Sequence, residues 1–107
     1  MSKKASVSHD EWMLEELHRD PKFAAEYLKQ SMVDMSDPEG RGAALLALRR
    51  VAEAHGGMAA IATEAGIQRE SLYRALSHNG NPTMNTLIAV LKSLGMRLTV
   101  EPDKKAA

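Results

Sequence analysis

Helix start and stop signals recur along this chain at short intervals, and they constrain its fold more than any other feature. Asp20-Pro21 and Asp37-Pro38 each combine a capping side chain with a proline at the first helical position, where the missing N–H costs nothing. The stretch from Ser8 to Glu11 has the form of a capping box. Gly56-Gly57 and Gly95 follow apolar segments, and glycine readily adopts the left-handed conformation that ends a helix. These signals predict a series of short helices.

Apolar residues between these signals recur at steps of three and four, which is typical of helices with one buried face. Strong helix formers dominate the composition, and aromatic residues make up only 4% of the chain. We therefore expect an all-α bundle of five to six helices. The expected helices follow Ser8, run from residue 21 to about 35, from 38 to the Gly56-Gly57 pair, over about 58–65, over about 68–77, and from Thr83 to Gly95. Trp12 could anchor a partner, since interface hot spots favour tryptophan, but as the single tryptophan of a small protein we expect it to pack in the core.

In the C-terminal segment, the spacing of the apolar residues changes from the helical three and four to every second residue. Met96, Leu98 and Val100 alternate with polar residues until Pro102 ends the run, which predicts a short β-strand over 96–101. A lone strand leaves its backbone groups unpaired, so it needs a partner. The partner is either another chain or the segment Ala5–Ser8, and the remaining alternative is an extended tail. We expect Met96, Leu98 and Val100 to contribute to dimerisation.

Composition excludes several functional classes. A chain of 107 residues suits one domain, and the absence of cysteine excludes disulfides, thiolate zinc sites and cysteine catalysis. The four histidines lack a metal-ligand spacing, and no nucleophile elbow or glycine-rich phosphate loop is present. No stretch resembles a membrane span or a signal sequence. We expect a cytoplasmic protein that is not an enzyme and uses no metal or cofactor.

The segment from Met58 to Ser77 is the most informative part of the chain. It predicts two short helices joined by a tight turn, with a small residue at Ala62 for a close crossing and with positive φ at Gly66. The residues placed to pack on the domain are Ile61, Ala65, Ile67, Leu72 and Ala75. The residues left facing outward are Gln68, Arg69, Glu70, Tyr73 and Arg74, which have the length to contact base edges in a major groove. An ordinary helical hairpin with a solvated polar face has the same pattern.

Two blocks of sequence resemble a known family. They are the segment from Gly66 to Ser77 followed by Gly80-Asn81-Pro82-Thr83, and the segment Leu91–Leu98, with looser similarity over 44–57 and 20–37. In these blocks the chain resembles the addiction-module antidote proteins of bacteria and their mobile elements. That family carries an XRE-like (Cro/C1-type) helix-turn-helix and is usually encoded beside a toxin of the RelE/ParE superfamily.

The resemblance implies a fold and two activities. Residues 1–37 would form an N-terminal helical segment, 38–95 a lambda-repressor-like domain with the helix-turn-helix, and 96–107 the strand and tail, all in one compact domain. Such an antitoxin binds and neutralises its toxin, and it represses its own operon by binding double-stranded operator DNA as a homodimer.

The resemblance also implies roles for individual residues. Base contacts are expected from Gln68, Arg69, Glu70 and Arg74, and phosphate contacts from Ser71, Tyr73, Asn79 and Asn81. Two of these positions have alternatives, because Tyr73 could pack against the preceding helix and Glu70 could pair with Arg74 within its own helix.

Two other functions remain open. One is a stand-alone helix-turn-helix transcriptional repressor, and the other is a protein-interaction module whose helix-turn-helix does not bind DNA. The net charge of zero argues against a nucleic-acid partner, but it is unevenly distributed. Residues 1–56 hold eight basic and ten acidic residues, a net of −2, whereas residues 57–107 hold six and four, a net of +2. This balance predicts weak non-specific DNA binding by one protomer, so that dimerisation is needed for useful affinity.

Overall fold

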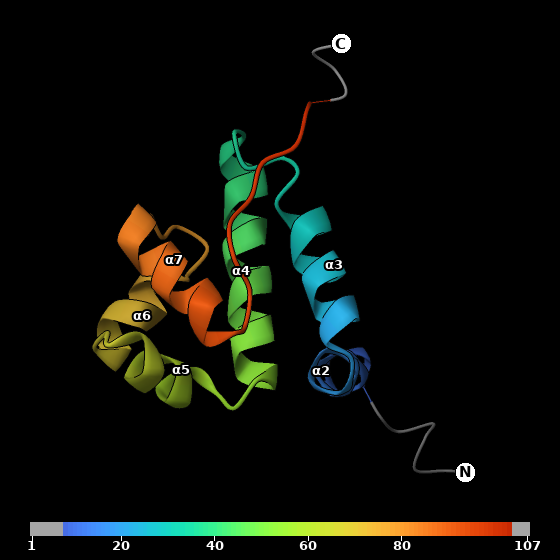
Figure 1. The fold of residues 1–107 in the computed structure, drawn as a ribbon, viewed down its shortest axis with the longest axis vertical. Coiled ribbons are helices and arrows are strands. Elements are labelled where there is room, and N and C mark those ends of the chain that lie inside the picture. The colour runs from blue at the N-terminus through green and yellow to red at the C-terminus, as the bar shows by residue number, and fades with distance from the viewer. Residues whose placement is uncertain (1–7, 104–107) are drawn as a thin grey trace.

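The computed structural model describes residues 8–103, and within this range the chain forms six helices and no β-strand. The helices are α2 (His9–Arg19), α3 (Pro21–Ser31), α4 (Pro38–Ala54), α5 (Met58–Ala65), α6 (Arg69–Ala75) and α7 (Met84–Ser93), as Figure 1 shows. The all-α fold and the number of helices agree with the sequence prediction.

Four helices begin at the side chains that the sequence predicts. The Ser8 hydroxyl accepts a hydrogen bond from the Glu11 N–H at 3.1 Å, and the Glu11 carboxylate accepts one from the Ser8 N–H at 3.1 Å. Asp20, Asp37 and Thr83 accept hydrogen bonds from the first backbone N–H groups of α3, α4 and α7. Each cap satisfies a backbone donor that the helix leaves unpaired, which is worth about 1 kcal/mol.

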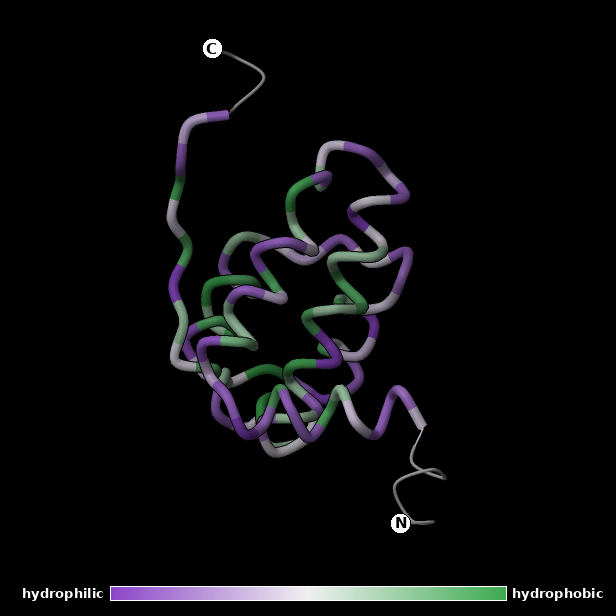
Figure 2. The backbone as a smooth tube through the Cα atoms, turned by 90° about the vertical axis from the view of Figure 1, so that its right-hand side faces the viewer, coloured by the Kyte–Doolittle hydropathy of each residue, from purple (hydrophilic) through white to green (hydrophobic). Residues whose placement is uncertain are grey.

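Helix α4 lies at the centre of the fold (Figure 1). Helices α2 and α3 pack against it and against each other, α5 packs against it as well, and α6 and α7 pack on α5. Leu45, Leu48 and Val51 of α4 are at most 2% exposed. They belong to one continuous hydrophobic core that reaches from Leu17 in α2 to Val90 in α7. Hydrophobic and hydrophilic residues alternate along the coils in Figure 2, as expected of helices with one buried face.

Helix α3 is shorter than the sequence predicts. It ends at Ser31 instead of about Met35, and residues 32–36 form turns. Asp37 must leave the helical conformation, because it precedes a proline and caps α4. The chain also passes close to α4 here, since a Cβ on Gly40 would lie only 2.1 Å from the Asp34 carbonyl oxygen. A continued α3 would have no room to make this connection.

The predicted C-terminal β-strand is absent from the described part of the chain. Residues 96–103 are extended and cross in front of α4 in the view of Figure 1, but no neighbouring strand among the described residues pairs with them. Met96 donates its N–H to the Leu91 carbonyl at 2.8 Å and packs against the core, and the Glu101 carboxylate lies 3.4 Å from the Lys29 ammonium of α3. The helices contact this tail only through side chains, because their backbone N–H and C=O groups are already hydrogen-bonded within each helix. They therefore cannot form the backbone hydrogen bonds of a β-sheet with it. Of the candidate partner segment Ala5–Ser8, only Ser8 is described, and it caps α2.

The expectation that Trp12 packs in the core is wrong. Its side chain is 46% exposed, and its ring lies 5.9 Å from the ring of His9. Helix α2 contacts the core through Met13 and Leu17. Trp12 is one step around the helix from Met13 and therefore points away from α4.

No helix in residues 8–103 combines the length and the apolar character that crossing a membrane requires.

Candidate nucleic-acid interface

Helices α5 and α6 are joined by a turn of three residues, as the sequence predicts. Gly66 adopts the left-handed conformation with φ 71° and ψ 34°. The Ile67 N–H donates to the Ala62 carbonyl at 2.9 Å, and the Gly66 N–H donates to the Thr63 carbonyl at 3.2 Å. These bonds end α5 and redirect the chain, so that Gln68 can cap α6 in an extended conformation. The turn therefore sets the angle at which α6 leaves α5.

The apolar residues of this helix pair face the core. Ile61, Leu72 and Leu76 are fully buried, and Ala62 is 3% exposed. Ile67 is partly buried and packs against the same cluster. Because the inner side of α6 is held in this way, its outer side is fixed in orientation relative to the rest of the fold.

The outer side of α6 carries the residues for which base contacts are expected. Gln68, Arg69, Glu70 and Arg74 are all exposed, and so is Tyr73. Among the residues for which phosphate contacts are expected, Asn79 and Asn81 are exposed in the loop after α6, whereas Ser71 is half-buried. The fold thus gathers seven of the eight predicted residues on accessible surface and turns Ser71 partly towards the interior.

Three exposed residues on α6, Glu70, Tyr73 and Arg74, have surroundings that the sequence left open. Glu70 and Arg74 form no ion pair, although their spacing would allow one. Tyr73 is 39% exposed, and the guanidinium carbon of Arg49 lies 4.9 Å from its ring centroid. Sequence reasoning missed Arg49, because the contact joins α4 to α6 across 24 residues of chain. No local pattern marks such a pair.

The loop after α6 is held against α4 by a close approach at Gly42. A Cβ at this position would lie 2.6 Å from the imidazole of His78, so only glycine fits while that ring stays in place. His78 in turn lies 3.4 Å from the side-chain oxygen of Asn79, measured from its Nδ1. The contact positions the loop that carries Asn79 and Asn81 beside α6.

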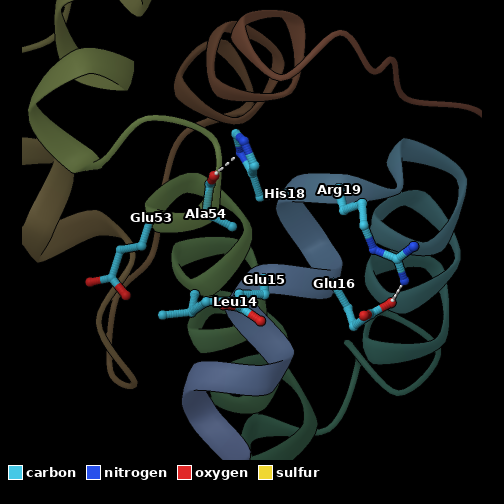
Figure 3. Close-up of a pocket in the computed structure, with 7 residues that line it drawn as sticks. All are labelled: Leu14, Glu15, Glu16, His18, Arg19, Glu53 and Ala54. Carbon is cyan, nitrogen blue, oxygen red and sulfur yellow. Dashed lines mark hydrogen bonds and ion pairs between the residues drawn. The ribbon is translucent and has the colours of Figure 1, made fainter. Parts of the chain in front are cut away.

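A separate pocket lies between α2 and the end of α4 (Figure 3). The carboxylates of Glu15, Glu16 and Glu53 line it, together with Leu14. The His18 ring is hydrogen-bonded to the Ala54 carbonyl at 3.0 Å, and Arg19 pairs with Glu16. Within residues 8–103 no group of three or more side chains of the types that bind metals could hold an ion. The exposed face of α6 remains the better candidate for a binding site.

Comparison with known proteins identifies the class to which this fold and surface belong. A family model described as probable addiction module antidote protein matches residues 11–102, and the chain therefore belongs to that family. A stretch of 62 residues, 58% of the chain, is 45% identical to an uncharacterized protein of Haemophilus influenzae Rd. The match spans 63% of that relative's length. No solved structure matches this chain.

The turn at Gly66 gives a test of how α6 is positioned. A Cβ at this residue would meet no atom within 4 Å, so Gly66→Ala adds no clash and only forces a non-glycine residue into the left-handed region. We expect Gly66→Ala to lower the free energy of unfolding by about 1–2 kcal/mol. Gly66→Asn should cost less, because asparagine tolerates this conformation. Urea unfolding followed by circular dichroism measures both, and equal stability of Gly66→Ala and the wild type would contradict the role of the turn.

Proposed function

We propose that this chain is the antitoxin of a type II toxin–antitoxin module, which neutralises a RelE/ParE-like toxin and represses its own operon by binding DNA as a dimer. The observation that carries the DNA-binding part is the exposed polar face of α6, which lies opposite the buried residues Ile61, Leu72 and Leu76 of the same helix pair. Membership of the antidote family supports the antitoxin part and implies a toxin partner. The role is regulatory, not enzymatic.

DNA recognition would be carried by the helix-turn-helix formed by α5 and α6, with α6 in the major groove. Arg69 and Arg74 can each donate two hydrogen bonds to guanine, Gln68 can bond adenine, and Glu70 can accept from cytosine. Tyr73, Asn79 and Asn81, which are exposed, would donate to phosphates around this helix, and the half-buried Ser71 would be less accessible to them. In a two-fold dimer the two copies of α6 would lie about 34 Å apart and contact the two halves of an inverted repeat.

The arginines of α6 allow a direct test. Arg69→Ala and Arg74→Ala should each weaken binding to the operator by about 1–3 kcal/mol and relax base preference at one position of each half-site. Arg19→Ala is the matched control, because Arg19 is exposed on α2 and pairs only with Glu16. Gel shifts with the promoter fragment of the chain's own operon, in parallel with a scrambled fragment, measure both effects. Operator binding that survives both substitutions would refute the assignment of α6.

Dimerisation is proposed to use the extended C-terminal segment. Val100 is 94% exposed and Leu98 is 42% exposed, so both present apolar side chains to solvent. Met96 is partly buried against the core, so it would support the interface by holding the start of this segment in place. Burial of such side chains between two copies would be favourable by the usual hydrophobic effect.

A double variant tests this interface without removing Met96 from the core. Leu98→Asp combined with Val100→Asp should convert a dimer to a monomer in light scattering, because each protomer would place two carboxylates in an apolar contact. Arg97→Gln combined with Thr99→Asp is the control, because both residues are exposed in the same segment and the pair of substitutions changes the net charge by the same −2. A double variant with the molar mass of the wild type would exclude this interface.

The toxin-neutralising role is tested separately from DNA binding. We expect a small toxin gene beside the gene for this chain, and expression of that toxin alone should arrest growth. Co-expression of the chain should restore growth, and the two proteins should copurify. The variant carrying Arg69→Ala and Arg74→Ala should still rescue growth, because it keeps the rest of the fold. Rescue without operator binding would indicate an interaction module, and operator binding without a neighbouring toxin would indicate a stand-alone repressor.

A further inference from the structure

One face of the central helix α4 lies beside α6 and the loop that follows it. Gly42, Leu46, Arg49 and Glu53 are spaced by four, three and four residues, so they lie on one face of α4. Gly42 lies under His78 from the loop after α6, and Arg49 lies over Tyr73 of α6. Leu46, between these two contacts, is 43% exposed. This face of α4 is therefore adjacent to α6, and it is accessible to solvent from Leu46 to Glu53, whereas Gly42 is buried.

Arg49 is held by a contact that uses the face of its guanidinium group. The guanidinium carbon lies 4.9 Å from the Tyr73 ring centroid, within the range of a cation–π interaction. A stacked guanidinium still has its N–H donors along the edge of the plane. Tyr73 thus fixes the position of the charge and leaves donors available for an anion.

The carboxylate partner of Arg49 does not use all of these donors. The Glu53 oxygen lies 3.7 Å from the Arg49 Nε, which is longer than a charge-assisted hydrogen bond. The side chains of Arg49 and Glu53 are 35% and 44% exposed, so the pair is accessible to a competing anion. By contrast, the neighbouring Arg50 is turned to α2, where its guanidinium lies 3.1 Å from the Asp10 carboxylate.

The cations near this position form a small group. Arg69 is four residues before Tyr73 and therefore lies on the same side of α6, and Arg74 follows Tyr73 directly. Arg49 brings a third positive charge to this surface from a different helix. Phosphate contacts along a duplex come from cations that flank the helix in the groove, whereas base contacts come from that helix itself.

We propose that Arg49 is a phosphate-contacting residue of the DNA surface, presented by its stack on Tyr73 and restrained by Glu53 in the unbound protein. The proposal rests on the DNA-binding part of the proposed function. On binding, the backbone phosphate replaces Glu53 as the partner of the guanidinium edge, while the ring of Tyr73 stays under its face. The contact adds affinity without adding base preference.

The first experiment compares Arg49→Ala with Arg50→Ala by fluorescence anisotropy. The two arginines are adjacent on α4 and almost equally exposed, at 35% and 36%, so they form a matched pair. Arg49→Ala should weaken binding to the promoter duplex and to a scrambled duplex by the same factor, about tenfold. The slope of log affinity against log salt should become shallower by about 0.9 for each bound protomer. Arg50→Ala should change neither quantity, and thermal unfolding of both variants reports any loss of folded protein.

The second experiment uses a gain of affinity, which misfolding cannot produce. Glu53→Gln removes the competing carboxylate and should tighten binding to both duplexes by about threefold. The same substitution in the Arg49→Ala background should give a clearly smaller gain, because the restrained guanidinium is then missing. An equal gain in both backgrounds would show a general charge effect and would overturn the role of Arg49.

The outcomes separate this proposal from the one on which it rests. If the wild type prefers the promoter duplex and loses that preference with Arg69→Ala, the proposed function stands. Arg49→Ala with wild-type affinity and salt slope would then overturn only the phosphate contact. A loss of preference among sequences in Arg49→Ala would also overturn it, because that result would indicate a base contact. A wild type that binds no duplex would refute DNA binding and the assignment of Arg49 together.

Discussion

The burial of α4 between the two halves of the fold is the constraint on which the rest of the structure depends. Its apolar residues receive α2 and α3 on one side and α5 on the other, and Leu48 at its middle is fully buried. Neither half could bury its apolar helix faces alone, because two or three short helices without this partner leave most of their apolar surface in water. The exposed face of α6 is rigid for the same reason, since its inner residues Leu72 and Leu76 belong to the same core.

Local signals were predictable from the sequence, because each depends on a few adjacent residues. The caps at Ser8, Asp20, Asp37 and Thr83 and the left-handed turn at Gly66 all lie where the residue types indicate. The separation of apolar and polar residues on α6 was predictable as well, since helical periodicity fixes which side chains share a face. These two kinds of signal are sufficient to define the candidate surface.

Features that join distant parts of the chain were not predictable in the same way. The alternation from Met96 to Val100 has the period of a strand, yet no strand lies beside this segment in residues 8–103, and an alternating pattern does not provide one. Trp12 is exposed because Met13 and Leu17 occupy the side of α2 that faces α4. The contact between Arg49 and Tyr73 depends on how α6 is oriented relative to α4. That orientation follows from the packing of the whole core.

The near-neutral composition means that acidic side chains lie among the arginines of the proposed DNA surface. Each protomer places carboxylates next to its arginines, with Glu70 between Arg69 and Arg74 in sequence and Glu53 beside Arg49. These carboxylates lower the local positive potential, so a random duplex gains little from binding. A matching duplex would gain more, because its base edges can use Glu70 as an acceptor, whereas the replacement of Glu53 by a phosphate is the same for every duplex. On the proposed function, the acidic residues on this surface favour discrimination between sequences over total affinity, and a second protomer in the proposed dimer would supply the additional affinity.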